Sequence, residues 1–115
     1  MGSTVLVVED NPIFRATAID MLETLGLKAF GAYSGESALG MIEAHPEIRL
    51  VFIDIRMPGM SGPDLAQRVR RRHPAMQIIM TSGYVAEDDA PPDFPFLAKP
   101  WRPDEIERTV AAASD

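Results

Sequence analysis

Three carboxylates in this sequence stand directly at the ends of short apolar runs. Glu9 and Asp10 follow the run at residues 4–8, and Asp54 ends the run at residues 50–54. Carboxylates that lie a few ångströms apart raise one another's pKa, so a cluster of them requires a cation. Oxygen ligands without His or Cys favour Mg²⁺, with Mn²⁺ or Ca²⁺ as substitutes. The three acids therefore predict a divalent-metal site.

A hydroxyl and an ammonium group stand at the ends of two further apolar runs. Thr81 and Ser82 end the run that begins at Met76, and Lys99 follows residues 96–98. Both are suitable partners for phosphoryl oxygens, because phosphoryl transfer needs positioning and charge neutralisation more than covalent help from the protein. A carboxylate can itself act as the nucleophile and form an acyl phosphate. Together with the acids, these residues predict phosphoryl transfer.

Each of these residues also has an ordinary structural interpretation. Glu9 and Asp10 could simply favour the start of a helix through its dipole. Thr81 alone would be a plain strand residue, and Lys99 alone would be a solvated lysine. Asp54 is the hardest to explain in this way, because a strand buried on both faces tolerates a charge only where it has a purpose. Ser82 remains an alternative to Thr81 for the hydroxyl role.

Short apolar runs alternate with stretches of helical period along the whole chain. Strands are expected at residues 4–8, 28–32, 50–54, 76–81 and 96–98. Helices are expected between them, capped by Asn11, Ser34 and Ser61, with a last helix that starts near Pro103 and fades after Val110. In the first helix the inner stripe is predicted to be Ile13, Ala16, Ile19, Met21, Leu22 and Leu25.

This alternation predicts an α/β fold, a (βα)5 doubly wound five-stranded parallel sheet with right-handed crossovers. Polar groups at the carboxyl ends of the strands then converge at one edge, over the first, third, fourth and fifth strands. The connection between the fourth and fifth strands contains Pro91, Pro92 and Pro95. Prolines at that density predict that the fourth helix is short or absent.

Composition limits the classes of protein to which the chain can belong. Its 115 residues, 46% of them hydrophobic, fit one domain over residues 4–115, after an N-terminal extension or expression scar at residues 1–3. The chain has no Cys, which suits the cytoplasm, and no apolar run of the roughly 20 residues that a membrane span needs. A formal charge of −6 argues against a nucleic-acid partner. The basic cluster Arg68, Arg70, Arg71 and Arg72 is interpreted as a solvated helix face.

Four motifs in order along the chain resemble the response-regulator receiver domain of two-component signalling. They are Glu9-Asp10, the run from Asp54 to Gly62, the run from Thr81 to Tyr84, and Lys99-Pro100. Each motif is weak alone, but the set covers nearly the whole chain. The resemblance implies a flavodoxin-like sheet with strand order 2-1-3-4-5.

The resemblance also implies a role for each site residue. Asp54 would be the phosphoacceptor. The metal would be bound by Asp10 directly, by Glu9 through water, by Asp54 and by the backbone carbonyl of Arg56. Thr81 and Lys99 would contact the phosphoryl group. Two further roles are implied: Phe96 would be a rotating aromatic that reports phosphorylation, and Pro100 would follow a cis peptide bond.

The implied partner is a histidine kinase or a histidine phosphotransfer domain, whose phosphohistidine supplies the phosphoryl group. Such a domain is not an enzyme in the usual sense, because it catalyses only its own phosphorylation and autodephosphorylation. The proline-rich segment departs from the family pattern and resembles the receivers of hybrid sensor kinases. We therefore expect a monomer rather than a dimer through the fourth-helix, fifth-strand and fifth-helix face. The downstream target is unknown.

Two functions from other classes compete with this one. A Mg²⁺-dependent phosphatase with an aspartyl-phosphate intermediate needs an acid two residues after its nucleophile, where this chain has Arg56. A flavin-binding, flavodoxin-like module needs a hydroxyl-rich first loop, where Glu9 and Asp10 would repel phosphate.

Overall fold

The computed structural model describes residues 4–83 and 93–114 of the chain. Five strands and four helices lie within these ranges. In chain order they are β1 (Thr4–Val8), α1 (Pro12–Thr24), β2 (Lys28–Ala32), α2 (Gly35–Ala44), β3 (Ile48–Asp54), α3 (Gly62–Arg72), β4 (Gln77–Ser82), β5 (Phe96–Ala98) and α4 (Pro103–Ser114).

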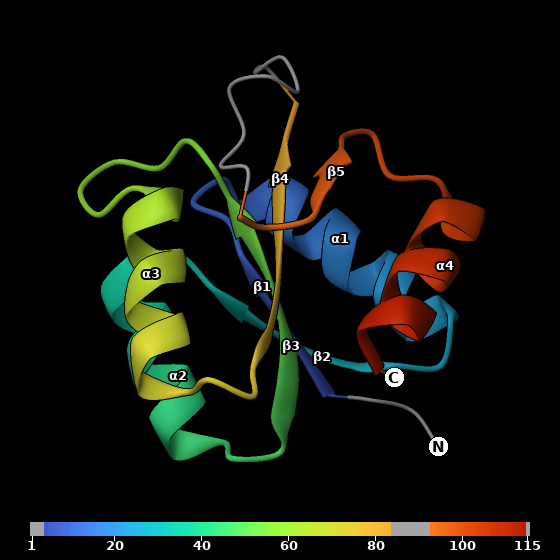
Figure 1. Cartoon of the computed structure of the whole chain (residues 1–115). Helices are drawn as coiled ribbons and strands as arrows, with labels where there is room; N and C mark the ends of the chain where they lie inside the picture. The colour runs from blue at the N-terminus through green and yellow to red at the C-terminus, as the bar shows by residue number, and fades with distance from the viewer. Residues whose placement is uncertain (1–3, 84–92, 115) are drawn as a thin grey trace.

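The five strands form one parallel sheet in the order β2-β1-β3-β4-β5, which confirms the predicted fold class. In Figure 1 the sheet stands between two helical layers, with α2 and α3 on one side and α1 and α4 on the other. Because every strand runs in the same direction, the ends of β1, β3, β4 and β5 meet at one edge of the sheet. That edge is where the candidate site residues were expected.

The core consists of two clusters, one on each face of the sheet. Alternate residues of the central strands supply them, since successive side chains of a strand point to opposite faces. On the α2 and α3 face, Leu6 and Ile53 pack with buried residues of both helices. On the α1 and α4 face, Phe52 and Trp101 pack with Leu22 and other helical residues. Burial on both faces explains why the strands read as continuous apolar runs.

Three predicted caps fix where the helices that follow β1, β2 and β3 begin. The side chain of Asn11 accepts hydrogen bonds from the backbone N–H groups of Ile13 and Phe14. Ser34 and Ser61 accept one such bond each, at the starts of α2 and α3. The first helix ends before Gly26, whose φ of 90° is readily adopted only by glycine. The capping signals in the sequence were therefore correct.

Strand β4 lies one residue later at each end than expected, at Gln77–Ser82. Three larger details also differ from the sequence expectations. Ile13 is 72% exposed and Ala16 is exposed as well, so these two residues do not contribute to the core as predicted. Strand β3 begins at Ile48 rather than at residue 50, because the exposed Arg49 interrupts the apolar run without ending the strand. Helix α4 continues to Ser114 instead of fading after Val110.

The expected short or absent helix between β4 and β5 falls largely on residues 84–92, and the N-terminal extension falls on residues 1–3. Both lie outside the described residues. Within the described ranges, no helix combines the length and the apolar character that crossing a membrane requires.

Candidate functional site

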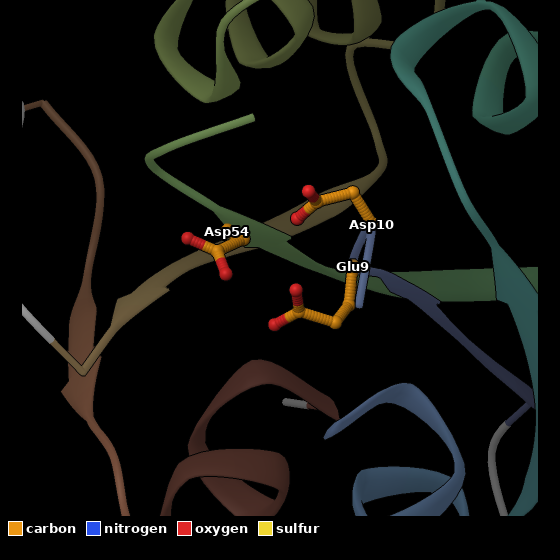
Figure 2. Close-up of side chains that lie close together, drawn as sticks. All are labelled: Glu9, Asp10 and Asp54. Atoms are coloured by element: carbon orange, nitrogen blue, oxygen red, sulfur yellow. The ribbon is translucent and has the colours of Figure 1, made fainter. Parts of the chain in front are cut away.

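The three predicted acids lie together at the carboxyl edge of the sheet. Glu9 and Asp10 follow β1, and Asp54 is the last residue of the neighbouring β3. One carboxylate oxygen from each lies within 4.8 Å of the others. Figure 2 shows the three side chains close together, with the carboxylates of Glu9 and Asp10 turned toward Asp54. Glu9 and Asp54 are nearly buried, at 4% and 8% exposure, whereas Asp10 is exposed.

Glu9 and Asp54 are held in closely matching ways. Each accepts a hydrogen bond from the backbone N–H two residues further on: Asn11 N–H to Glu9 Oε2 and Arg56 N–H to Asp54 Oδ1, both at 3.0 Å. Their remaining oxygens, Glu9 Oε1 and Asp54 Oδ2, both accept from Lys99 Nζ, the latter at 3.1 Å. Each carboxylate is thus fixed by its own loop on one side and by the lysine on the other.

Lys99 follows β5 and lies between the two buried acids. Burial alone would lower the pKa of Lys99, but the hydrogen bond from its ammonium to Glu9, together with the negative charges of Asp54 and Glu9, outweighs burial and raises it. The ammonium therefore stays charged at neutral pH. The Lys99–Pro100 peptide bond is cis, as the resemblance implied.

The donor set fits a divalent cation. Three carboxylates and one ammonium leave a formal charge of −2 at the cluster, which one divalent ion balances. Carboxylate oxygens from two loops, without His or Cys, are the hard ligands that Mg²⁺ prefers. Asp10 is exposed and accessible to an ion from solvent. Arg56, whose carbonyl was predicted as a further ligand, contributes to the same pocket.

A pocket of about 670 Å³ opens from the acids along helix α1. Glu9, Asp10, Asp54 and Lys99 line it, and apolar residues, among them Phe14 and Trp101, line the rest. Its volume is in the range of small-molecule pockets, so a small ligand has room to reach Asp54.

In the structure the Thr81 hydroxyl hydrogen-bonds to other residues of the protein and does not face the acidic cluster. Thr81 Oγ1 donates to the Leu97 carbonyl at 2.7 Å and accepts from Trp101 Nε1 at 2.9 Å, on the α1 and α4 side of the sheet. The adjacent Ser82 is also buried, at the very end of β4, and its carbonyl accepts from the Lys99 N–H at 3.0 Å. The resemblance implied Thr81 for the hydroxyl role, with Ser82 as the alternative, and these partners of the Thr81 hydroxyl bring Ser82 back into consideration.

Phe96 lies on β5, partly buried, and packs against the core cluster on the α2 and α3 face. This position is compatible with a plain packing role. Its rotation on phosphorylation stays a prediction.

Sequence reasoning missed three neighbours of the site. Phe14 places its ring 5.6 Å from Lys99 Nζ. Arg15 donates from its guanidinium to the Glu9 carbonyl at 2.8 Å. Trp101, predicted as a packing residue, also donates a hydrogen bond to Thr81. The contacts of Phe14 and Trp101 with Lys99 and Thr81 join residues far apart in the chain, and the sequence carries no local signal for them.

Comparison with known proteins agrees with this geometry. The family model of the response regulator receiver domain matches residues 5–111. The sensor kinase CckA of Brucella abortus is 37% identical over 95% of the chain, and the response regulator receiver protein CpdR of the same organism is 31% identical over 95%. A solved structure of NtrX from Brucella abortus has a TM-score of 0.88 and 28% identity, and the match covers 98% of the chain and 27% of NtrX.

The relatives differ in how much of their length the match covers. The chain spans 12% of CckA, 3% of the histidine kinase mak3 of Schizosaccharomyces pombe and 10% of the sensor kinase LuxN of Vibrio campbellii, but 98% of CpdR. The match is therefore to one unit that occurs within kinases and also by itself. With the family model covering nearly all of its residues, the chain belongs to the response regulator receiver domains of two-component signalling.

Proposed function

We propose that the chain accepts a phosphoryl group on Asp54 in a Mg²⁺-dependent reaction, and that the resulting aspartyl phosphate switches its conformation. The observation that carries the proposal is the position of the Asp54 carboxylate. It is nearly buried at the carboxyl edge of the sheet, with Lys99 Nζ 3.1 Å from Oδ2 and two further carboxylates beside it. A buried acid with a cation and a metal-binding set around it is suited to act as a nucleophile toward phosphorus.

In the proposed reaction an Asp54 carboxylate oxygen attacks phosphorus, and the bond between phosphorus and the donor's imidazole nitrogen breaks. Lys99 neutralises charge on the phosphoryl oxygens, and the Arg56 N–H orients the attacking carboxylate through Oδ1. Glu9, Asp10, Asp54 and the Arg56 carbonyl would hold Mg²⁺, whose chemistry when bound is charge neutralisation at the phosphoryl group. Autodephosphorylation is the only other reaction we assign to the domain.

For the hydroxyl that contacts the phosphoryl group we favour Ser82 over Thr81. The Thr81 hydroxyl is already committed to Leu97 and Trp101. Ser82 is one residue further along β4, and successive residues of a strand point to opposite faces, so its side chain does not share the Thr81 environment. Ser82→Ala is expected to slow phosphorylation or shorten the lifetime of the phosphorylated state.

The proposed donor is a phosphohistidine of a histidine kinase or of a phosphotransfer domain. Relatives named as sensor or histidine kinases, of which this chain matches one segment, support that choice. We place the exchange in the cytoplasm, which a chain without Cys suits. Neither rival function gains support: Arg56 stands where the phosphatase needs an acid, and the acidic loop after β1 does not suit a flavin phosphate.

The test is incubation with Mg²⁺ and acetyl phosphate, or with a phosphorylated histidine phosphotransfer domain, followed by intact-mass measurement. We expect a gain of one phosphoryl group that is lost in Asp54→Asn. Asp64→Asn is the matched control, because it makes the same chemical change at an exposed position on α3. A wild-type chain that binds Mg²⁺ but gains no mass with either donor would refute the proposal.

A further inference from the structure

The Thr81 hydroxyl makes two buried hydrogen bonds that the phosphoryl-transfer site does not use. It donates to the Leu97 carbonyl at 2.7 Å and accepts from the Trp101 indole N–H at 2.9 Å. Thr81 is 3% exposed and Trp101 is 7% exposed, so water cannot readily replace either bond. Thr81 also contributes no surface to the pocket that holds Asp54 and Lys99. Its hydroxyl therefore acts on the protein rather than on a ligand.

The two partners of this hydroxyl lie on either side of Lys99 in the chain. Leu97 is two residues before Lys99 and Trp101 is two residues after it, so one side chain of β4 holds both ends of the lysine segment. Between these two points, the Lys99 N–H donates to the Ser82 carbonyl at 3.0 Å. The segment that carries Lys99 is thus attached to β4 at three alternate residues: through the backbone at Leu97 and Lys99, and through the indole at Trp101.

Trp101 connects the same segment to the acceptor strand. Its ring lies 4.8 Å from the ring of Phe52, at a tilt of 43°. Phe52 is two residues before Asp54 on β3, and Phe52 is itself fully buried. One indole therefore contacts the strand that carries the acceptor through its ring and, through its N–H, the strand beside it. This arrangement fixes the origin of the lysine side chain relative to the carboxylate that it contacts.

We propose that Thr81 and Trp101 are positioning residues, which through their mutual hydrogen bond hold Lys99 against Asp54 for phosphoryl transfer. The inference rests on the proposed function of Asp54 for its effect on rate, but the positioning of Lys99 is testable without that function. It gives Thr81 a different role from direct contact with the phosphoryl group.

The first experiment compares phosphorylation rates at saturating Mg²⁺ with acetyl phosphate as donor. Thr81→Val removes the hydroxyl at nearly constant shape, and Thr81→Ser keeps it. We expect the valine variant to react about tenfold more slowly, since misplacement of a reacting group by an ångström can cost up to 10²-fold, and the serine variant to regain most of the rate. Thr109→Val is the matched control, because Thr109 Oγ1 also bonds a backbone carbonyl, that of Glu105, within α4 and away from the site.

A double-mutant cycle separates positioning from direct contact. Trp101→Phe keeps an aromatic ring and removes the N–H. If the two residues act through their shared bond, the double variant Thr81→Val/Trp101→Phe is about as slow as the slower single variant. Additive losses, a serine variant as slow as the valine variant, or a valine variant as fast as wild type would each overturn the proposal.

Two further measurements do not depend on phosphorylation. The chain has one Trp, so its indole N–H gives a single NMR signal, which should shift in Thr81→Val and return in Thr81→Ser. In thermal unfolding, the losses from Thr81→Val and Lys99→Met should be less than additive, and full additivity would overturn the proposed coupling between the Thr81 hydroxyl and Lys99. A wild-type chain that takes no phosphoryl group would refute the proposed function, whereas this unfolding cycle would still decide the positioning role.

Discussion

Replacement of Gly62 by alanine provides a severe test of how the acceptor loop is packed. A Cβ atom at Gly62 would lie 2.2 Å from the Asp54 carbonyl oxygen, 2.8 Å from Ile55 Cα and 2.9 Å from the Asp54 carbonyl carbon. All three are backbone atoms and cannot rotate away. Gly62 is not among the glycines with positive φ, so its backbone conformation is open to alanine and the cost comes from contact alone.

The size of the effect follows from how firmly that backbone is held. The Ile55 N–H donates to the Thr81 carbonyl at 2.9 Å, and the Gly62 N–H donates to the Ile55 carbonyl at 3.1 Å. The chain must retreat by about 1 Å to reach ordinary contact distances. Overpacking of this kind costs about 1–3 kcal/mol, and a weakened backbone hydrogen bond adds about 1 kcal/mol. We expect a loss of roughly 3 kcal/mol, which for a domain of this size lowers Tm by roughly 12 °C.

The assay is thermal unfolding followed by circular dichroism, with Gly40→Ala as the matched control. Gly40 is exposed within α2, and a Cβ there meets nothing within 4 Å. Alanine in an open helical position is expected to stabilise by about 0.5–1 kcal/mol. A Gly62→Ala chain whose Tm matches that of wild type, or rises as in Gly40→Ala, would refute the reasoning. Since the clash falls on the Asp54 backbone, phosphorylation should fall as well.

Three more predictions concern charge at the site. Asp10→Asn should weaken Mg²⁺ binding by on the order of tenfold or more, because loss of a residue that only supports a metal ligand already lowers metal affinity 10–100-fold. Trp101 lines the same pocket, so its fluorescence can follow the Mg²⁺ titration. An unchanged affinity would contradict the ligand role of Asp10. Lys99→Met leaves Glu9 and Asp54 without their cation, so Mg²⁺ should raise the Tm of this variant by more than that of wild type. Equal increments would contradict this. Without Mg²⁺, the raised pKa of Lys99 means that its contribution to the free energy of unfolding is complete below the unfolded pKa of about 10.4 and is lost as pH rises through the folded value. Urea unfolding at a series of pH values should show this loss of free energy of unfolding in wild type but not in Lys99→Met. If the free energies of the two proteins changed in parallel with pH, the prediction would be wrong.

The elements of the fold were readable from the sequence because their signals are local. Buried parallel strands require continuous apolar runs, and Asn11, Ser34 and Ser61 are residue types that favour the N-cap position, which indicates where the helices begin. The position of Asp54 at the end of such a run pointed to the site for the same reason. Parallel strands then bring Glu9, Asp10 and Lys99 to the same edge without further information.

What the sequence did not settle depends on geometry finer than a run of residues. Helical period identifies an apolar stripe on α1, but not how far the neighbouring layers extend to cover it, and so Ile13 was misplaced. Thr81 and Ser82 are adjacent, and a shift of one residue along a strand reverses which face a side chain joins. The bond of Thr81 to Trp101 joins positions 20 residues apart, for which spacing gives no indication.

The contact of Lys99 with Glu9 joins residues 90 positions apart and depends on β5, the strand that directly precedes Lys99. Strand β5 has three residues and lies at the edge of the sheet, so it has few hydrogen bonds with which to resist local opening. An excursion of β5 and α4 would withdraw the lysine while β1 and β3 kept the acids in place. The domain would then lose its ability to react through a local opening, whose free energy is lower than that of global unfolding. Native-state hydrogen exchange of β5 would therefore measure how often the domain is folded but unable to receive a signal.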